Sequence, residues 1–488
     1  MSTTIILAIV AAYFALLLAI AYYTSRGADN ESFFIGEKKS NWLLVAYGMI
    51  GTSLSGVTFM SVPGEVHTKG FAYLQVVIGY FIGYMVVAFV LLPLYYRLQL
   101  TSIYSYLQTR LGEVSYKTGA SFFILSRTLG ASIRIYLVLI VLQHFLLDAL
   151  HVPFYVTVFV ILLMILLYTF QGGVKTIVWT DTLQTTGMIL ALIITIVLIG
   201  HELNFSFGQL WAAISDNGYT QTFQTSDWKA SNFFLKQILG GAVVTITMTG
   251  MDQEMMQKNI SVSTIGKSQK NMFLFSAILV VVNLLFLILG GALFVYLQAK
   301  GIEFPAKSDE VFSLVAINHL PPIAGLIFII GLISALFPSA DGALTALTSS
   351  FCIDILGMKE KSDWSESKRA TIRKAVHLSI TVLFFALILI YQQVIESSVI
   401  STILKVAAYT YGPLLGLFAF GILTQRKVKD ILVPVICLVS PAVCWLLSLN
   451  SEKWFDGYQF GLELLFINGL ITFLGLWLIS SNDNQVYS

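Results

Sequence analysis

The sequence predicts an all-α protein that crosses a membrane many times. Of its 488 residues, 57% are hydrophobic and only 11% are charged, whereas soluble domains carry about 25% charged residues. Apolar runs of about 20 residues recur along the chain, and each is long enough to cross the roughly 30 Å hydrocarbon core of a bilayer. Composition and run length therefore make the lipid bilayer the first expected partner.

Thirteen membrane spans can be assigned in chain order, because each apolar run is separated from the next by polar or charged residues. They cover residues 3–24, 41–63, 71–98, 118–148, 153–171, 176–200, 231–255, 270–299, 320–353, 371–395, 399–423, 428–448 and 458–480. These spans leave no room for a sizeable soluble domain, so we expect a single transmembrane domain over residues 1–488. An odd number of spans places the two termini on opposite sides of the membrane.

The basic residues predict the orientation of the chain. Nineteen of the 28 Lys and Arg residues lie in loops that follow odd-numbered spans, six lie in the alternate loops, and three lie inside spans. Short cytoplasmic loops of membrane proteins carry an excess of Lys and Arg. We therefore expect a multi-pass protein of the cell (plasma or inner) membrane with its N-terminus outside and its C-terminus in the cytoplasm.

Other sequence features argue against several classes of function. Cys352, Cys437 and Cys444 lie in or beside apolar runs, and the six histidines are scattered. We find no nucleotide-binding or zinc-ligand motif and no pairing of a nucleophile with a base. We therefore expect no cofactor, no transition metal, no nucleic-acid partner and no enzymatic activity. These patterns do not determine the oligomeric state.

Two of the spans contain residues that interrupt a helix. The second contains GTSLSGVTFMSVPG at residues 51–64, and the seventh contains GAVVTITMTGMDQ at residues 241–253. Small and hydroxyl-bearing residues also allow helices to pack closely, which is the alternative explanation. The two segments lie five spans apart, as the first helices of two inverted repeats would, and transporters form their sites at such breaks. We expect core repeats at approximately 41–200 and 231–423.

Several motifs identify a family resemblance. The segment GMDQEMMQK at residues 250–258 resembles the signature G-[TF]-[DN]-Q-x-x-x-Q-[RK] of the sodium:solute symporter family. FFIGEKKSNW, SVPGEVHTKG, GGVKTIVWTDTLQ and YGPLLGLFAFGIL follow the family's order along nearly the whole chain. The resemblance implies a 5+5 inverted-repeat fold of the leucine-transporter type, with one helix before the ten-helix core and two after it. That total agrees with the thirteen spans.

The resemblance also implies a sodium site between the second and ninth spans. The family's A-x-x-[ST]-[ST] pattern falls on residues 335–339. The implied sodium ligands are the carbonyls of Gly51, Leu54 and Ala335 and the hydroxyl of Ser339. Pro338 stands where the family has the first of two adjacent hydroxyls, so one ligand oxygen is lost there. Proline also frees a carbonyl one turn earlier, which could partly compensate.

Two carboxylates define an expected second site for a cation or a proton. Some family members bind a second sodium with an aspartate that corresponds to Asp181, and the matching positions of the ninth span are Asp341 and Gly342. Two facing carboxylates can both be ionised only with a cation between them, and otherwise one of them takes a proton. The alternative is that Asp341 only repairs the hydrogen bonding that Pro338 disrupts.

On the implied fold, the organic substrate lies near mid-membrane between the second, third, fourth, seventh and eleventh spans. Met248 stands at the position of the aromatic gate in sugar carriers, and the other substrate candidates are polar residues of those spans. The full set of candidates is Ser53, Ser55, Thr58, Gln75, Arg134, Thr245, Met248, Thr249 and Lys405. Arg134 corresponds loosely to the arginine that holds a carboxylate in the sialic acid carrier, although it could instead pair with a carboxylate of the bundle. These cations favour an anionic substrate.

These expectations define a function and its rivals. We expect a sodium-coupled secondary symporter that imports a small organic solute or anion by alternating access. One rival is a proton-coupled carrier that uses Asp181 and Asp341. The other is a sensor or channel of the same fold that does not accumulate its solute.

Overall fold

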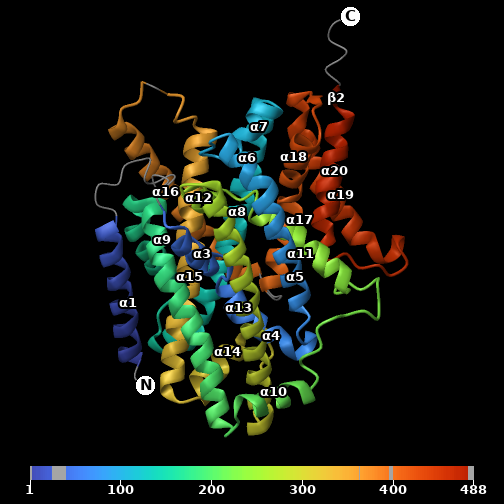
Figure 1. The fold of residues 1–488 in the computed structure, drawn as a ribbon. Coiled ribbons are helices and arrows are strands. Elements are labelled where there is room, and N and C mark those ends of the chain that lie inside the picture. The colour runs from blue at the N-terminus through green and yellow to red at the C-terminus, as the bar shows by residue number, and fades with distance from the viewer. Residues whose placement is uncertain (1–2, 25–39, 362, 395–398, 482–488) are drawn as a thin grey trace, which may run out of the picture.

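The protein is a bundle of long helices, and its computed structural model describes residues 3–24, 40–361, 363–394 and 399–481 (Figure 1). The longer helices are α1 (Thr3–Thr24), α3 (Trp42–Ser53), α4 (Gly56–Lys69), α5 (Tyr73–Val86), α8 (Glu113–Leu142), α9 (Phe154–Glu202), α10 (Phe207–Asp216), α11 (Phe234–Met248), α12 (Gln253–Ile260), α13 (Ile265–Lys300), α15 (Pro322–Ser350), α16 (Glu366–Val394), α17 (Val399–Thr410), α18 (Gly412–Leu423), α19 (Val433–Trp454) and α20 (Glu463–Leu478). The shorter elements are α6 (Leu92–Arg97), α7 (Ser105–Arg110), α14 (Val311–Ser313) and the paired strands β1 (Lys427–Val428) and β2 (Ser480–Ser481).

Length and hydropathy confirm a polytopic membrane protein. Within the described residues, seven helices are long and apolar enough to cross a membrane, or up to ten if each of three bent helix pairs counts as one crossing. Three shorter apolar helices, Ala8–Thr24, Phe154–Phe170 and Glu463–Leu478, fall on predicted spans. Helix α9 contains both predicted spans 153–171 and 176–200. The total of thirteen crossings stays a prediction.

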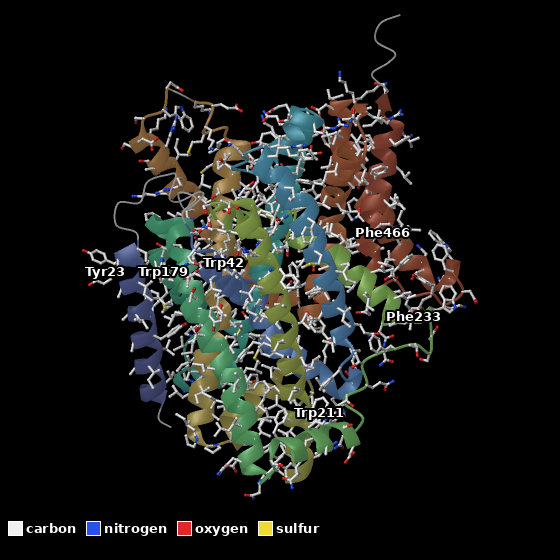
Figure 2. The ribbon with its side chains drawn as sticks, viewed as in Figure 1. Tyr23, Trp42, Trp179, Trp211, Phe233 and Phe466 are labelled. Carbon is white, nitrogen blue, oxygen red and sulfur yellow. The ribbon has the colours of Figure 1, made fainter. Side chains whose placement is uncertain are left out.

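The Tyr and Trp side chains labelled in Figure 2 lie at two levels of the bundle. Figure 2 places Tyr23, Trp42 and Trp179 at one level and Trp211 towards the opposite end. Tyr23 is 69% exposed and Trp179 is 51% exposed. Tyr and Trp are enriched at the two membrane–water interfaces, where their amphipathic rings lie at the level of the headgroups. The first described residues of α1 and the strand β2 lie at opposite ends of the bundle (Figure 1), although which end is cytoplasmic stays a prediction.

Both predicted helix interruptions are confirmed. Helices α3 and α4 meet at an angle of 58°, and α11 and α12 meet at 67°. At the first break Leu54 and Ser55 leave the helical conformation, with ψ angles of 73° and 173°. At the second break the side chain of Asp252 caps α12 by accepting hydrogen bonds from the backbone N–H groups of Glu254 and Met255. Backbone polar groups near both breaks are thus available to a site.

A third break was not predicted. Helices α17 and α18 meet at 42° around Tyr411. Pro413 stands in the first turn of α18, where a missing N–H does no harm. The sequence Tyr-Gly-Pro at residues 411–413 was the available signal.

Helix α15 lies at the centre of the bundle. Every residue from Gly331 to Ser350 is buried. Pro338 lies inside this helix, and Asp341 stands less than one turn beyond it. A carboxylate therefore lies in the most enclosed part of the protein, where only neighbouring side chains, the backbone or an ion can balance its charge.

Candidate functional site

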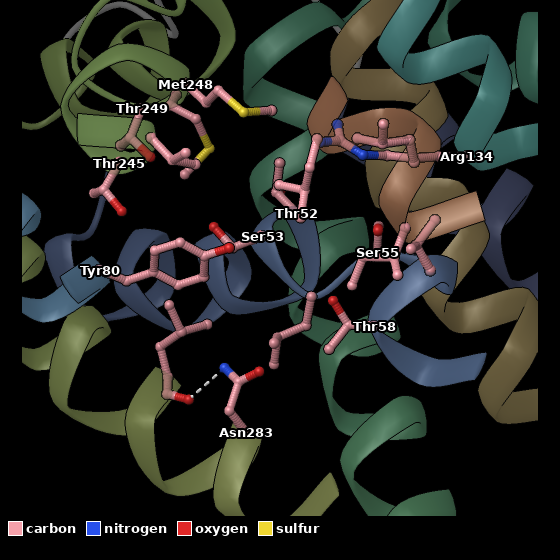
Figure 3. A pocket seen from close by; sticks show the side chains of 18 of the residues that line it. Thr52, Ser53, Ser55, Thr58, Tyr80, Arg134, Thr245, Met248, Thr249 and Asn283 are labelled. Atoms are coloured by element: carbon pink, nitrogen blue, oxygen red, sulfur yellow. Dashed lines mark hydrogen bonds between the residues drawn. The ribbon is translucent and has the colours of Figure 1, made fainter. Parts of the chain in front are cut away.

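A central cavity of about 110 Å³ lies beside the α3–α4 break. Its walls come from that break and from α5, α8, α11, α12, α13 and α17. Figure 3 shows the guanidinium of Arg134 on one side of the cavity, and Thr245, Met248 and Thr249 across from it. Hydroxyls, two arginines and apolar side chains thus line one cavity, as is typical of a small-molecule site.

Most of the predicted substrate residues line this cavity. They are Ser53, Ser55, Thr58, Arg134, Thr245, Met248 and Thr249. The break explains how Ser53 and Ser55, which are two residues apart, both reach the cavity. The hydroxyl groups can accept or donate hydrogen bonds, so they suit a ligand with several oxygen atoms.

Gln75 and Lys405 lie elsewhere. Both line a second cavity of about 620 Å³, whose walls include the end of α4, the start of α5 and the start of α20. The side-chain amide of Gln75 donates to the carbonyl of Ala72, and its oxygen accepts from the backbone N–H of Gln224. Gln75 is therefore engaged in holding a loop, and neither residue belongs to the central cavity.

The two cavities adjoin each other. Tyr73, Ile400 and Leu404 line both of them. A solute in the larger cavity is thus separated from the central one by these three side chains. This arrangement provides a route into the site from one end of the bundle.

Helix α3 ends against α15, and both helices carry expected sodium ligands. A Cβ built on Gly51 would lie 3.5 Å from Cγ of Pro338, so the two helices are in contact at that point. The backbone N–H of Gly51 donates to Oγ1 of Thr185 on α9 at 3.1 Å. Carbonyls in the last turn of a helix lack partners within that helix. The carbonyls of Gly51 and Leu54 are therefore candidates for an ion.

Ser339 is the expected sodium ligand that the structure supports best. Its side chain is 1% exposed, and its hydroxyl has no hydrogen-bond partner among the described residues. Leaving a buried hydroxyl unpaired costs about 1–3 kcal/mol. Ala335, one turn earlier on the same helix, is fully buried. The carbonyl and hydroxyl oxygen atoms of these residues suit a small hard cation such as sodium, which favours oxygen ligands.

Asp181 and Asp341 have different surroundings. Asp181 accepts from the ammonium of Lys258 at 2.7 Å and from the hydroxyl of Thr52 at 3.3 Å. Asp341 accepts from the hydroxyl of Tyr168 at 2.7 Å and from the backbone N–H of Gly342 at 2.6 Å. The cation beside Asp181 therefore belongs to the protein, and sequence reasoning missed it although Lys258 lies in the quoted GMDQEMMQK motif.

The two arginines of α8 also differ. Arg127 forms an ion pair with Glu254, and its other terminal nitrogen lies 3.7 Å from the carboxylate of Asp252. Asp252 also accepts from the hydroxyl of Tyr411 at 3.1 Å. Arg134, two turns further along α8, forms no ion pair with any residue in the described part of the chain. Arg127 is thus paired within the protein, whereas Arg134 lines the cavity without a carboxylate partner in the described residues.

Other lining residues carried no signal in the sequence. Tyr80 and Tyr84 of α5 and Asn283 of α13 line the cavity. The amide nitrogen of Asn283 donates to the carbonyl of Leu279, whereas its oxygen has no partner in the part of the chain described here. Tyrosines and a single asparagine in apolar spans resemble ordinary core residues, so only their position in space reveals them.

Comparisons with known proteins agree with this geometry. The model of the sodium:solute symporter family matches residues 33–430. The sodium/sialic acid symporter SiaT of Proteus mirabilis is 24% identical, with 87% of each chain covered. Sodium-coupled monocarboxylate transporter 1 of Xenopus laevis is 25% identical over 84% of this chain and 67% of its own length.

A solved structure of a Na⁺-coupled sialic acid symporter, in a substrate-bound outward-open state, covers 97% of each chain with a TM-score of 0.83 and 21% identity. That likeness confirms the leucine-transporter-type fold. The family match over most of the chain then decides its class. The protein belongs to the sodium:solute symporter family, whose members couple the movement of a small solute to sodium.

Proposed function

We propose that this symporter carries one small carboxylate-bearing monoanion with sodium. A single observation carries the proposal: Arg134 lines the central cavity and has no ion-pair partner among the described residues. An unpaired charge in a partly dry site costs several kcal/mol. A carboxylate of the substrate would remove that cost, and Arg presents a planar fork that matches two carboxylate oxygens.

The ion pairs of the cavity wall support a substrate with a single carboxylate. The wall contains one other cation, Arg127, whose terminal nitrogens already face the carboxylates of Glu254 and Asp252. Arg134 has no carboxylate at ion-pair distance among the described residues. The relatives named for sialic acid and for monocarboxylates take substrates that, by those names, carry a carboxylate.

Sodium and substrate would be coupled through the α3–α4 break. The proposed sodium ligands Gly51 and Leu54 alternate with Ser53 and Ser55, which line the cavity. An ion that holds the carbonyls of the break also holds these hydroxyls in position. Sodium thus raises the affinity for substrate, and thermodynamic reciprocity requires that substrate raises the affinity for sodium by the same factor.

The remaining parts of the proposal concern the route. Lys405 lines the larger cavity, so it would attract an anion before the anion passes Tyr73 and Leu404 into the central site. The solute would enter from outside the cell, in agreement with the basic loops that predict an external N-terminus. Each sodium ion that moves inward gains about 2.3 kcal/mol per 100 mV, and a monoanion that moves with it offsets that gain for one ion. We propose that the protein carries its solute without covalent chemistry and has no enzymatic activity.

A ligand screen tests this proposal. Purified protein is heated with a panel of monocarboxylates, dicarboxylates, neutral sugars and amino acids, each in sodium and in choline buffer. We expect a monocarboxylate to raise the melting temperature only in sodium, and Arg134→Gln to abolish that shift. Stabilisation by a neutral sugar that Arg134→Gln retains would refute the assignment of an anion.

A further inference from the structure

A further cavity, of about 650 Å³, lies where α6, α7 and α18 meet at one end of the bundle (Figure 1). Two of its lining residues are cations, Arg97 and Arg110, and none of the described lining residues is acidic. The basic loops predict that this end of the bundle faces the cytoplasm. The cavity therefore carries an excess of positive charge at a predicted membrane surface.

Neutral backbone groups hold Arg110 in place. Its Nε donates to the carbonyl of Gly421 at 3.1 Å, and its two terminal nitrogens donate to the carbonyls of Thr424 and Arg426. A guanidinium has five N–H donors, so two of them remain for another acceptor. Arg110 forms no ion pair within the described part of the chain. Its positive charge is thus fixed in position without a carboxylate beside it.

Arg97 has no partner within the protein. It is the last residue of α6, and it is exposed. Its side chain forms no hydrogen bond and no ion pair with any residue that the structure describes. Two guanidinium groups on one cavity, of which one is fixed and the other is unpaired, form a site for an anion. Arginine suits phosphate in particular, because its planar fork can bind two oxygen atoms at once.

The cavity wall next to the arginines is apolar. Val90 and Leu94 stand two turns and one turn before Arg97, on the same face of a helix that is long and apolar enough to cross the membrane. Val90 is 47% exposed, and Leu423, at the end of α18, is 75% exposed. With a rise of 1.5 Å per residue, the apolar wall extends about 10 Å from Arg97 towards the middle of the membrane. The cavity thus has a cationic end and an apolar end.

We propose that this cavity binds one anionic phospholipid of the surrounding membrane, with its head group between Arg97 and Arg110 and its acyl chains against Val90 and Leu94. Basic pockets between membrane helices on the cytoplasmic side bind such head groups. A free phosphate ion would satisfy the arginines but would leave the apolar wall uncovered, whereas a phospholipid covers both ends. The inference is independent of the solute that the central cavity carries.

Native mass spectrometry of the purified, delipidated full-length protein tests the inference. Phosphatidylglycerol and phosphatidylcholine with the same acyl chains are added in equal amounts, and the lipids that stay bound are counted. We expect the wild type to retain one phosphatidylglycerol in preference to phosphatidylcholine. Arg97→Gln should weaken the binding of that phosphatidylglycerol by roughly 10-fold or more, because it removes a hydrogen bond between two charged groups.

Lys117→Gln is the matched control. It removes the same charge, but Lys117 pairs with Glu113 at 3.2 Å and does not line the cavity, so this variant should bind phosphatidylglycerol like the wild type.

Three results would overturn the inference. The first is equal retention of the two lipids by the wild type, and the second is unchanged binding of phosphatidylglycerol by Arg97→Gln. The third is displacement of phosphatidylglycerol by an equal concentration of glycerol 3-phosphate, which would show that the site recognises phosphate alone. If Arg97→Gln does not fold, the lipid preference of the wild type and its resistance to glycerol 3-phosphate decide.

Discussion

Replacing Ser339 with alanine should raise stability in sodium-free buffer and reduce the stabilisation that sodium provides. The serine hydroxyl is buried and has no partner among the described residues. Without sodium, Ser339→Ala removes an unsatisfied polar group whose burial costs about 1–3 kcal/mol. We therefore expect the variant to be more stable than the wild type in choline buffer, by up to that amount.

The stabilisation that the variant gains from sodium binding should be smaller than that of the wild type. At a sodium concentration 100 times the dissociation constant, binding stabilises the wild type by about 2.7 kcal/mol. A contact between a hydroxyl and a charge is worth about 1.5–3 kcal/mol, which is roughly 10–150-fold in affinity. At the same sodium concentration the variant should then gain only about 0.3–1.3 kcal/mol.

Thermal unfolding of the purified protein in matched choline and sodium buffers measures both effects. Ser334→Ala on the same helix is the control, because the hydroxyl of Ser334 is already paired with that of Tyr13 at 2.9 Å. It should lose about 1 kcal/mol in both buffers and keep the full sodium shift. A Ser339→Ala protein with the wild-type sodium shift would show that this hydroxyl is not a ligand.

Three further predictions concern Arg134, Arg127 and Gly342. Arg134→Gln should weaken binding of the carboxylate found in the ligand screen by about 2–5 kcal/mol, or roughly 30-fold to several thousand-fold, in a sodium-dependent uptake assay. Arg127→Gln should instead lower stability by about 3–5 kcal/mol, because it removes the nearer of the two buried cations that face Glu254. Equal effects of the two variants on stability would contradict the distinction between them. Gly342→Ala should destabilise the protein by about 1–3 kcal/mol, since the added methyl group overlaps the carboxylate of Glu254, which its ion pairs hold in place. Gly266→Ala, which has open space around it, is the control and should be neutral in the same unfolding assay.

The sequence was informative where the signal is local. Gly51, Ser53 and Ser55 stand in one short segment with few strong helix formers, and the structure has its break at that place. The break between α17 and α18 was missed although Gly412 and Pro413 mark it. A proline is also accepted in the first turn of a helix, so its presence alone does not distinguish a new helix from a continuing one.

Most of the substrate candidates could also be selected from the sequence. Thr245 and Thr249 are polar residues one turn apart in an apolar helix, and both line the cavity. Gln75 is also a polar residue in an apolar helix, yet its side chain forms hydrogen bonds with backbone groups and does not line that cavity. A buried polar side chain needs a partner in any case, and the sequence does not say whether that partner is a ligand or the protein's own backbone.

The sequence by itself determined that this protein spans a membrane and that some of its helices are broken. Hydropathy and helix propensity are properties of residues that are close together in the sequence, so they can be read without the tertiary structure. Only the tertiary structure decided which charges are balanced. Lys258 meets Asp181 across 77 residues, and Arg127 meets Glu254 across 127 residues. Arg134, which is also a cation of α8, is left to face the cavity. Electrostatic pairing depends on distance in space, and this chain brings those partners together only when its helices pack.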